Sequence, residues 1–337
     1  MWKRDQPSER SRSRRRVTAA PPLAPLATAV IGVGRQGRRH AQKLAALQGS
    51  RLVAVVDIDA ARAREVAGEL GVTALSDCRE LPGEVSAAIV ATPTSTHYEV
   101  ARSLLDAGIH VLIEKPMTTA MEHARALVEV ANGRRLVLQV GHLERFNPVV
   151  LAMADRVSQP QFIESVRVAP YTQRALDVSV VLDLMIHDID LIHTFVKSPM
   201  QHVDAVGRAV FTDNIDVANA RITFVNGCVA NVTSSRISSK TERTLRIFQP
   251  DSYLSADLRN MTLTHYLAKA SRPVTRPADL EIRNESFGPG DALLEQAQAF
   301  LDSVAGGPPP LANGRVAMHA LETATLINRI VAAPRAS

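Results

Sequence analysis

Short apolar runs alternate with longer amphipathic segments over the first half of the chain. The runs are apolar nearly throughout, as strands covered on both faces must be, and occupy residues 28–31, 52–56, 87–91, 111–113 and 136–140. Helical periodicity fills the intervals at residues 38–47, 60–70, 96–107 and 120–131. Strand and helix in steady alternation predict a doubly wound parallel sheet. We therefore expect an α/β Rossmann domain over residues 28–148.

The pattern of polar and apolar residues changes in the second half of the chain. One predicted strand precedes a single helical segment at residues 178–196, and strand patterns in which polar and apolar residues alternate follow it. Asn226-Gly227 lies between two of these later strands and is a strong hairpin signal. The predicted strands cover residues 161–168, 218–225, 228–234, 244–248 and 253–257, and the closing helices cover 291–304 and 316–332. Residues 149–337 are therefore expected to form an α+β domain for substrate binding and oligomerisation. Its sheet should be mostly antiparallel and open-faced, with the last helices free to pack back on the first domain.

The formal charge of +5 lies at one end of the chain, because the first 16 residues hold seven basic and two acidic side chains. We expect residues 1–27 to be a disordered basic tail. A nucleic-acid contact through this tail is the alternative, whereas the neutral folded body is not expected to bind nucleic acid. No apolar run reaches the roughly 20 residues of a membrane span. Cys78 and Cys228 lack metal-ligand spacing, so we expect no metal, and so few thiols suit a cytoplasmic protein.

A glycine motif directly follows the first predicted strand and opens the first predicted helix. Gly32 permits the tight turn, Gly34 lets the backbone approach a pyrophosphate, and Gly37 allows the helix to pack on the sheet. Arg35 and Gln36 complete the motif and are expected to lie at the cofactor. In this context the motif predicts a dinucleotide site, with the phosphates at the helix N-terminus.

The second predicted strand leads into Asp57, which lies 20 residues after Gly37. A carboxylate here accepts hydrogen bonds from the adenosine ribose and repels a 2′-phosphate, so NAD is favoured over NADP. Arg62 and Arg64 lie close enough in sequence to keep NADP open as the less favoured cofactor.

The carboxyl ends of two later strands should border the same cofactor. Thr92, Pro93 and His97 follow one of them, and Glu114 and Lys115 close the other. Thr92 could instead cap the helix that comes next. All five residues are expected to contact the dinucleotide.

Glu114-Lys115-Pro116 gives the sequence a specific resemblance. The glycine motif, Asp57, Thr92-Pro93, this tripeptide and Gly141-His142 follow one another in the order found in the Gfo/Idh/MocA oxidoreductases, which the chain resembles from residue 28 to its final helix. A second signature of that family, Asp and His four residues apart on one helix, matches Asp183 and His187.

Helical geometry supports the second signature independently. Asp183, His187 and Asp190 recur at i, i+4 and i+7, which forms one narrow polar stripe on an otherwise apolar helix. Such a stripe could face water, but the wide apolar surround favours a cleft lined by titratable groups.

The resemblance implies oxidation of a secondary sugar hydroxyl with NAD. Such a reaction needs a base for the hydroxyl proton, and His187 is suited to that role because its ordinary pKa is near 6.5. Asp183 would orient His187 or bind a neighbouring hydroxyl, and Lys115 would hold the reacting oxygen; the sequence leaves open whether Lys115 or His187 takes the proton. Arg145 and Asn147 are expected to contact cofactor or substrate, although Asn147 before a proline could be a helix cap.

Within the family, the segments around Gly141 and Asp183 look most like nucleotide-sugar dehydrogenases. This implies action at C3 of a UDP-N-acetyl-hexosamine in bacterial lipid A or surface-polysaccharide synthesis. The alternatives are an inositol or free-sugar dehydrogenase, an NAD-dependent glycosidase and a non-catalytic NAD and sugar sensor. A homodimer or homotetramer is expected, because an open sheet leaves an apolar face to bury.

Overall fold

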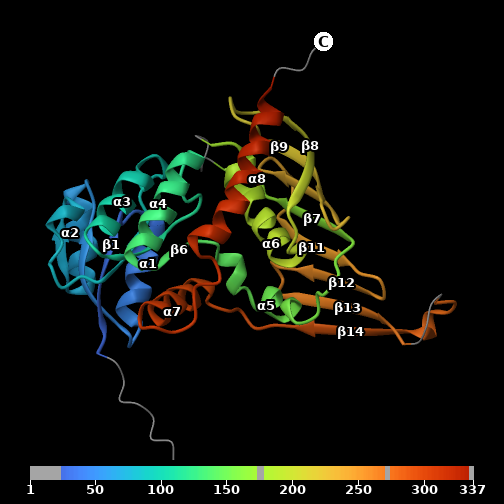
Figure 1. Cartoon of the computed structure of the whole chain (residues 1–337), viewed down its shortest axis with the longest axis horizontal. Helices are drawn as coiled ribbons and strands as arrows, with labels where there is room; N and C mark the ends of the chain where they lie inside the picture. The colour runs from blue at the N-terminus through green and yellow to red at the C-terminus, as the bar shows by residue number, and fades with distance from the viewer. Residues whose placement is uncertain (1–23, 173–177, 270–273, 334–337) are drawn as a thin grey trace, which may run out of the picture.

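The computed structural model describes residues 24–172, 178–269 and 274–333. Two sheets lie at opposite ends of the molecule, with helices packed between and around them (Figure 1). The expected tail at residues 1–27 lies largely outside the described residues, and its last two positions already belong to the first strand. Among the described helices, none has the length and apolar character required to cross a membrane.

The N-terminal sheet has six parallel strands in the order β3-β2-β1-β4-β5-β6, which is the doubly wound Rossmann order. In chain order its strands and helices are β1 (Leu26–Ile31), α1 (Arg35–Ala46), β2 (Ser50–Val56), α2 (Ala60–Leu70), β3 (Thr73–Leu75), β4 (Ala87–Val90), α3 (His97–Asp106), β5 (His110–Ile113), α4 (Met121–Arg134) and β6 (Leu138–Val140). Their apolar side chains are buried on both faces, which explains the near-continuous hydrophobic runs. The α/β prediction is confirmed, and β3 is the strand that it missed.

The second sheet has eight strands in the order β14-β13-β12-β11-β7-β10-β9-β8. They are β7 (Phe162–Val168), β8 (Met200–Arg208), β9 (Val217–Phe224), β10 (Val229–Ser235), β11 (Glu242–Phe248), β12 (Ser252–Asp257), β13 (Thr262–Ala268) and β14 (Leu280–Ser286). All neighbours are antiparallel except β7 and β10. The mostly antiparallel sheet is confirmed, including the hairpin at Asn226-Gly227, while β8, β13 and β14 were missed.

Helices cover one face of this large sheet. They are α5 (Pro148–Ala154), α6 (Ile186–Val196) and α8 (Gly314–Ala332), and Figure 1 shows them on the side that faces the Rossmann domain. The buried side chains of β7, β9, β10 and β11 alternate along each strand and join the core with α6 and α8. Helix α7 (Ala292–Val304) instead packs against α1, and its Phe300 and Leu301 complete a separate core on the first sheet. The last quarter of the chain therefore ties the two sheets together.

The predicted helix at residues 178–196 is interrupted by a π-helical turn, Val181–Met185, before α6 begins. In this turn Ile186 N–H donates to the Val181 carbonyl, five residues back. A π turn widens the helix locally, and such turns are frequent at functional sites. It falls on Asp183, one of the two residues of the second family signature.

Candidate active site

The glycine loop between β1 and α1 has the geometry of a dinucleotide cradle. Gly32 has φ +81°, and a Cβ there would lie 2.8 Å from Thr92 N. A Cβ on Gly37 would collide with the carbonyl oxygen of Gly32, so the start of α1 packs directly on the turn. Gly34 has open space where a Cβ would be, and Arg35 beside it is exposed. The loop therefore offers backbone N–H groups and one free-standing cation at a helix N-terminus, which suits a pyrophosphate.

Asp57 is 6% exposed at the end of β2. Its carboxylate accepts hydrogen bonds from Val33 N and Asp59 N, both at 2.9 Å. Arg62 Nη1 lies 3.3 Å from both carboxylate oxygens. The glycine loop thus holds this carboxylate in place, and its remaining acceptor sites can take ribose hydroxyls. Ile58, which is 96% exposed beside it, offers an apolar surface suited to an adenine ring.

Glu114 links the glycine loop to the end of β5. Its Oε1 accepts from Gln36 Nε2 at 3.2 Å and lies 2.8 Å from His40 Nε2. Its Oε2 accepts from Lys115 N at 3.1 Å, and Gly141 leaves no room for a Cβ against it. Glu114 and Gln36 were expected to contact the cofactor. The structure directs both side chains toward each other, so they position the loop and Lys115, and their expected contact with the cofactor stays a prediction.

His97 also has a positioning role within the protein. It is 1% exposed, and its ring nitrogens lie 2.9 Å from the carbonyl oxygens of Thr92 and Pro116. Both ring nitrogens face backbone oxygens, and the expected contact of His97 with the cofactor stays a prediction. The ring holds together the ends of β4 and β5, so that Thr92, Pro93 and Lys115 border the same edge of the sheet. Thr92 receives a hydrogen bond from Thr96 Oγ1 at 2.9 Å and provides no helix cap.

Lys115 reaches across to the second domain. Its Nζ donates to the Asp183 carbonyl oxygen at 2.7 Å and lies 3.2 Å from Asp183 Oδ1. The side chains are 19% and 25% exposed, so the ion pair is partly desolvated and still accessible. Residues 68 positions apart in the sequence therefore meet at the interdomain junction, next to the π turn.

His187 lies one turn beyond Asp183, at the start of α6. Its Nδ1 is buried and has no hydrogen-bond partner among the described residues. Burial, followed by the positive charges of Lys115 and Arg167, places the pKa of His187 well below its ordinary value. The imidazole is therefore neutral near pH 7 and can accept a proton.

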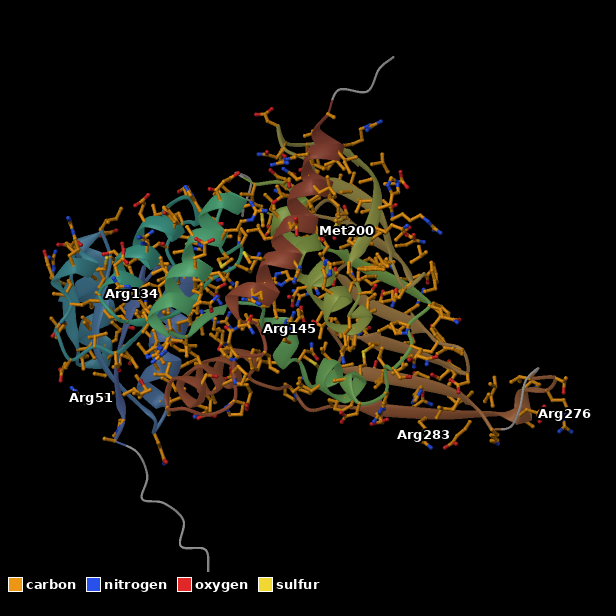
Figure 2. The ribbon with its side chains drawn as sticks, in the orientation of Figure 1. Arg51, Arg134, Arg145, Met200, Arg276 and Arg283 are labelled. Atoms are coloured by element: carbon orange, nitrogen blue, oxygen red, sulfur yellow. The ribbon has the colours of Figure 1, made fainter. Side chains whose placement is uncertain are left out.

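Asp190 does not share the accessible side of this stripe. It is 1% exposed, and both of its oxygens accept from Arg145 at 2.7 Å. Arg145 Nη1 also donates to the Leu311 carbonyl at 2.8 Å, and Figure 2 places this arginine between the two sheets. The Arg145 side chain is 7% exposed and joins α6 to the loop before α8, and its expected contact with cofactor or substrate stays a prediction.

The side chain of Asn147 also forms hydrogen bonds within the protein. Its Oδ1 accepts from Val149 N at 3.0 Å as the N-cap of α5, and Nδ2 donates to Leu258 O at 3.3 Å. The helix-cap alternative is confirmed, and the expected contact of Asn147 with cofactor or substrate stays a prediction. The cap fixes the chain that leaves the Rossmann domain.

Fold and site together define a nicotinamide-dependent oxidoreductase, with a dinucleotide cradle on one domain and a neutral histidine beside a lysine at the junction with the next. Residues 26–142 match the oxidoreductase family with an NAD-binding Rossmann fold, and residues 156–250 match the GFO/IDH/MocA C-terminal domain. The chain belongs to the Gfo/Idh/MocA family, and its cofactor is NAD.

Similar proteins support this assignment over nearly the whole length. UDP-N-acetylglucosamine 3-dehydrogenase from Acidithiobacillus ferrooxidans is 40% identical over 309 residues, which is 91% of this chain and 97% of that protein. Its solved structure superposes with a TM-score of 0.85 and covers 91% of this chain and 98% of the other. The scyllo-inositol 2-dehydrogenase (NAD(+)) of Bacillus subtilis is 28% identical over 84% of this chain and 87% of its own length. Levoglucosan dehydrogenase in complex with NADH, at 18% identity and TM-score 0.81 over 91% of this chain and 97% of that one, shares the fold.

Several residues at the site were not predicted. His40 on α1 sits four residues beyond Gln36 on the same helix face, and this spacing could have suggested that the two share a partner. Arg167 forms a bidentate pair with Asp188 and also contacts Glu144 at 2.8 Å. No signal in the sequence connects these three, because their pairing depends on how β7 packs against α6.

Proposed function

We propose that this chain oxidises the 3-hydroxyl of UDP-N-acetylglucosamine, with NAD as the oxidant. The observation that carries the proposal is the contact of Lys115 with Asp183 beside a neutral His187, at the end of β5 where a nicotinamide bound on the glycine loop would lie. The 40% identity to a protein of that activity over 91% of the chain supports the choice of substrate. A cytoplasmic role in bacterial lipid A or surface-polysaccharide synthesis is part of the proposal, and two free cysteines are compatible with a reducing compartment.

The residues at the junction have distinct tasks in this reaction. Bound NAD supplies the hydride acceptor, C4 of its nicotinamide. His187, whose imidazole is neutral before the reaction, takes the hydroxyl proton. The Lys115 ammonium stabilises the negative charge that develops on the oxygen, and Asp183 holds that ammonium at 2.7 and 3.2 Å. The carbon loses its hydride, the oxygen loses its proton, and a ketone remains.

The test is an assay of NADH formation with a panel of sugars. Purified protein should reduce NAD with UDP-N-acetylglucosamine and give a 3-keto product in mass spectrometry. An aminotransferase with an amino donor is included, because it traps the ketone if the equilibrium favours the alcohol. Free N-acetylglucosamine should react poorly, since binding of the distant UDP group positions C3.

Two outcomes would contradict the proposed substrate. Turnover of myo-inositol or scyllo-inositol without turnover of the nucleotide sugar would move the chain to the inositol branch of the family. Absence of turnover with every sugar, despite NAD binding, would support a sensor that binds both ligands.

A further inference from the structure

Three arginines gather at the edge of the large sheet that borders the candidate active site. Arg167 on β7 and Arg243 on β11 are register partners across the two strands, so their side chains project on the same face. Arg259 follows β12, in a turn whose Leu258 N donates to Arg243 O at 2.8 Å. The face is the helix-covered one, but it is uncovered at this end, where the Arg243 side chain is 47% exposed.

The nearby carboxylates of Asp188 and Glu144 already pair with Arg167. This arginine is 4% exposed and has two carboxylate partners, Asp188 at 2.9 Å and Glu144 at 2.8 Å. Arg243 reaches the same Glu144 oxygen only at 3.7 Å. Two cations therefore share one carboxylate, and the exposed one has the weaker contact.

Arg259 adds a further positive charge to this edge. Its Nη1 donates to the Thr241 carbonyl at 2.9 Å, which brings the guanidinium to the chain just before Arg243. The pKa of Arg243 is lowered by partial burial and then by the charges of Arg167 and Arg259. Arg243 and Arg259 thus form an incompletely neutralised pair of guanidinium groups, which an anion would stabilise.

Arg243 lies close enough to the reacting groups for its charge to act on His187. Asp188, which binds Arg167, is the neighbour of His187 in α6, and the charge of Arg243 contributes to the lowered pKa of His187. Leu258 O, next to Arg259, accepts from Asn147, which follows the end of β6. An anion on Arg243 and Arg259 would therefore face the same junction as Lys115 and His187, while the glycine loop that suits the dinucleotide phosphates lies on the other domain.

We propose that Arg243 and Arg259 form a phosphate-binding subsite that holds the diphosphate of a nucleotide-sugar substrate. The inference rests on the proposed function and specifies which side chains select a nucleotide sugar over a free sugar. Planar guanidinium groups match phosphate oxygens in a bidentate manner, and their attachment to β11 and to the turn after β12 fixes the distance from the diphosphate to His187.

The test measures binding of UDP by calorimetry at saturating NAD, so that the dinucleotide site is already filled. Arg243→Ala and Arg259→Ala should each weaken UDP binding by about tenfold, and Arg243→Lys should weaken it less, because it keeps the charge without the fork. The matched control is Arg246→Ala. This arginine lies on the same strand, is 44% exposed and pairs with Glu164 on the opposite face of the sheet. It should leave UDP binding unchanged.

Steady-state kinetics separates this subsite from the reaction itself. The KM for UDP-N-acetylglucosamine should rise by about tenfold in Arg243→Ala and Arg259→Ala. Their affinity for NAD should stay close to that of the unsubstituted protein. Circular dichroism melts identify any unfolded variant, in which case Arg243→Lys carries the test.

The outcomes distinguish the subsite from the proposed function. If UDP binding is lost in the variants although no nucleotide sugar is oxidised, the subsite stands and the proposed function fails. If UDP-N-acetylglucosamine is oxidised and both alanine variants keep the original KM and UDP affinity, the subsite is wrong and the proposed function stands. Failure of the unsubstituted protein to bind UDP at all also overturns the subsite.

Discussion

Individual residues at the junction combine two properties that catalysis needs, accessibility and fixed charge. The Lys115 side chain is 19% exposed while the Asp183 carbonyl and carboxylate hold its ammonium, and His187 is kept neutral by its surroundings. The positioning pairs behind them are more deeply buried. Arg145 with Asp190 is an example, since it leaves no exposed charge for a ligand to use.

Replacement of Lys115 or His187 should therefore affect turnover rather than cofactor binding. Lys115→Met and His187→Ala should each lower kcat by two orders of magnitude or more, about the size of general acid-base and electrostatic contributions. NAD affinity, measured by calorimetry, should be maintained. Near-normal turnover in a folded variant would remove that residue from the catalytic set.

The pH profile of Lys115→Met carries a second expectation. The Lys115 ammonium disfavours protonation of His187, so its removal should raise the pKa of the imidazole. The neutral base is then lost at a higher pH. The acid limb of kcat/KM for the residual activity should move upward from its position in the unsubstituted protein, and a downward move would contradict His187 as the base.

Asp57 should determine the choice between NAD and NADP. The carboxylate is held by Val33 N and would repel a 2′-phosphate, so NAD should bind at least tenfold more tightly, a difference of about 1.4 kcal/mol or more. Asp57→Ala should narrow the gap, since Arg62 would then be free to pair with the phosphate. The control variant is Asp59→Ala. Asp59 resembles Asp57 in pairing with Arg62, but its carboxylate caps α2. Equal affinities in the unsubstituted protein would refute the expectation.

At the scale of elements, periodicity predicted those strands and helices that bury a continuous face. Strand β3 was not predicted because it has only three residues, none of them fully buried. Strand β8 was not predicted because polar residues such as Gln201, His202 and Asp204 dominate its first half. Helix α6 was predicted in place, but its polar stripe could not reveal that Asp190 turns inward toward Arg145. That pairing joins residues 45 positions apart and depends on tertiary packing.

Helix α6 also carries a buried histidine that should make stability depend on pH. His193 packs against Phe224 and lies 2.8 Å from Thr323 Oγ1 of α8, and burial lowers its pKa to about 4. Well above pH 6.5 the histidine is neutral in both folded and unfolded chains. As the pH falls below 6.5 the unfolded chain gains a proton that the folded protein excludes, so stability is lost, by about 1 kcal/mol at pH 5.5.

Thermal melts between pH 7.5 and 5.5 check this expectation. His193→Gln should lose less stability over that interval than the unsubstituted protein, because glutamine does not titrate. His202→Gln is measured beside it as the control for replacement of a surface histidine, since His202 on β8 is 64% exposed. Identical slopes for His193→Gln and the unsubstituted protein would contradict the assignment.

At the scale of the whole molecule, the large sheet has one face with no helix packed on it among the described elements (Figure 1). This face is less apolar than expected, because Asn219, Arg221 and Arg246 occupy its centre. A ladder of neighbouring rings lies toward one end of the strands and is formed by Phe162, Phe248, Tyr253 and Tyr266. We call these four side chains the aromatic row.

The aromatic row should be the apolar centre of a homo-oligomer interface. Its rings are partly exposed in the single chain, and aromatic residues are enriched at interface centres, where they gain most from burial. Sedimentation analysis at micromolar concentration should show a dimer or tetramer. Tyr253→Arg should shift the population toward monomer, because a charge would then be buried opposite its own copy. Leu151→Arg, at a residue 48% exposed on α5, should leave the assembly intact. A monomer for the unsubstituted chain, or an unchanged oligomer in Tyr253→Arg, would show that this face is not the interface.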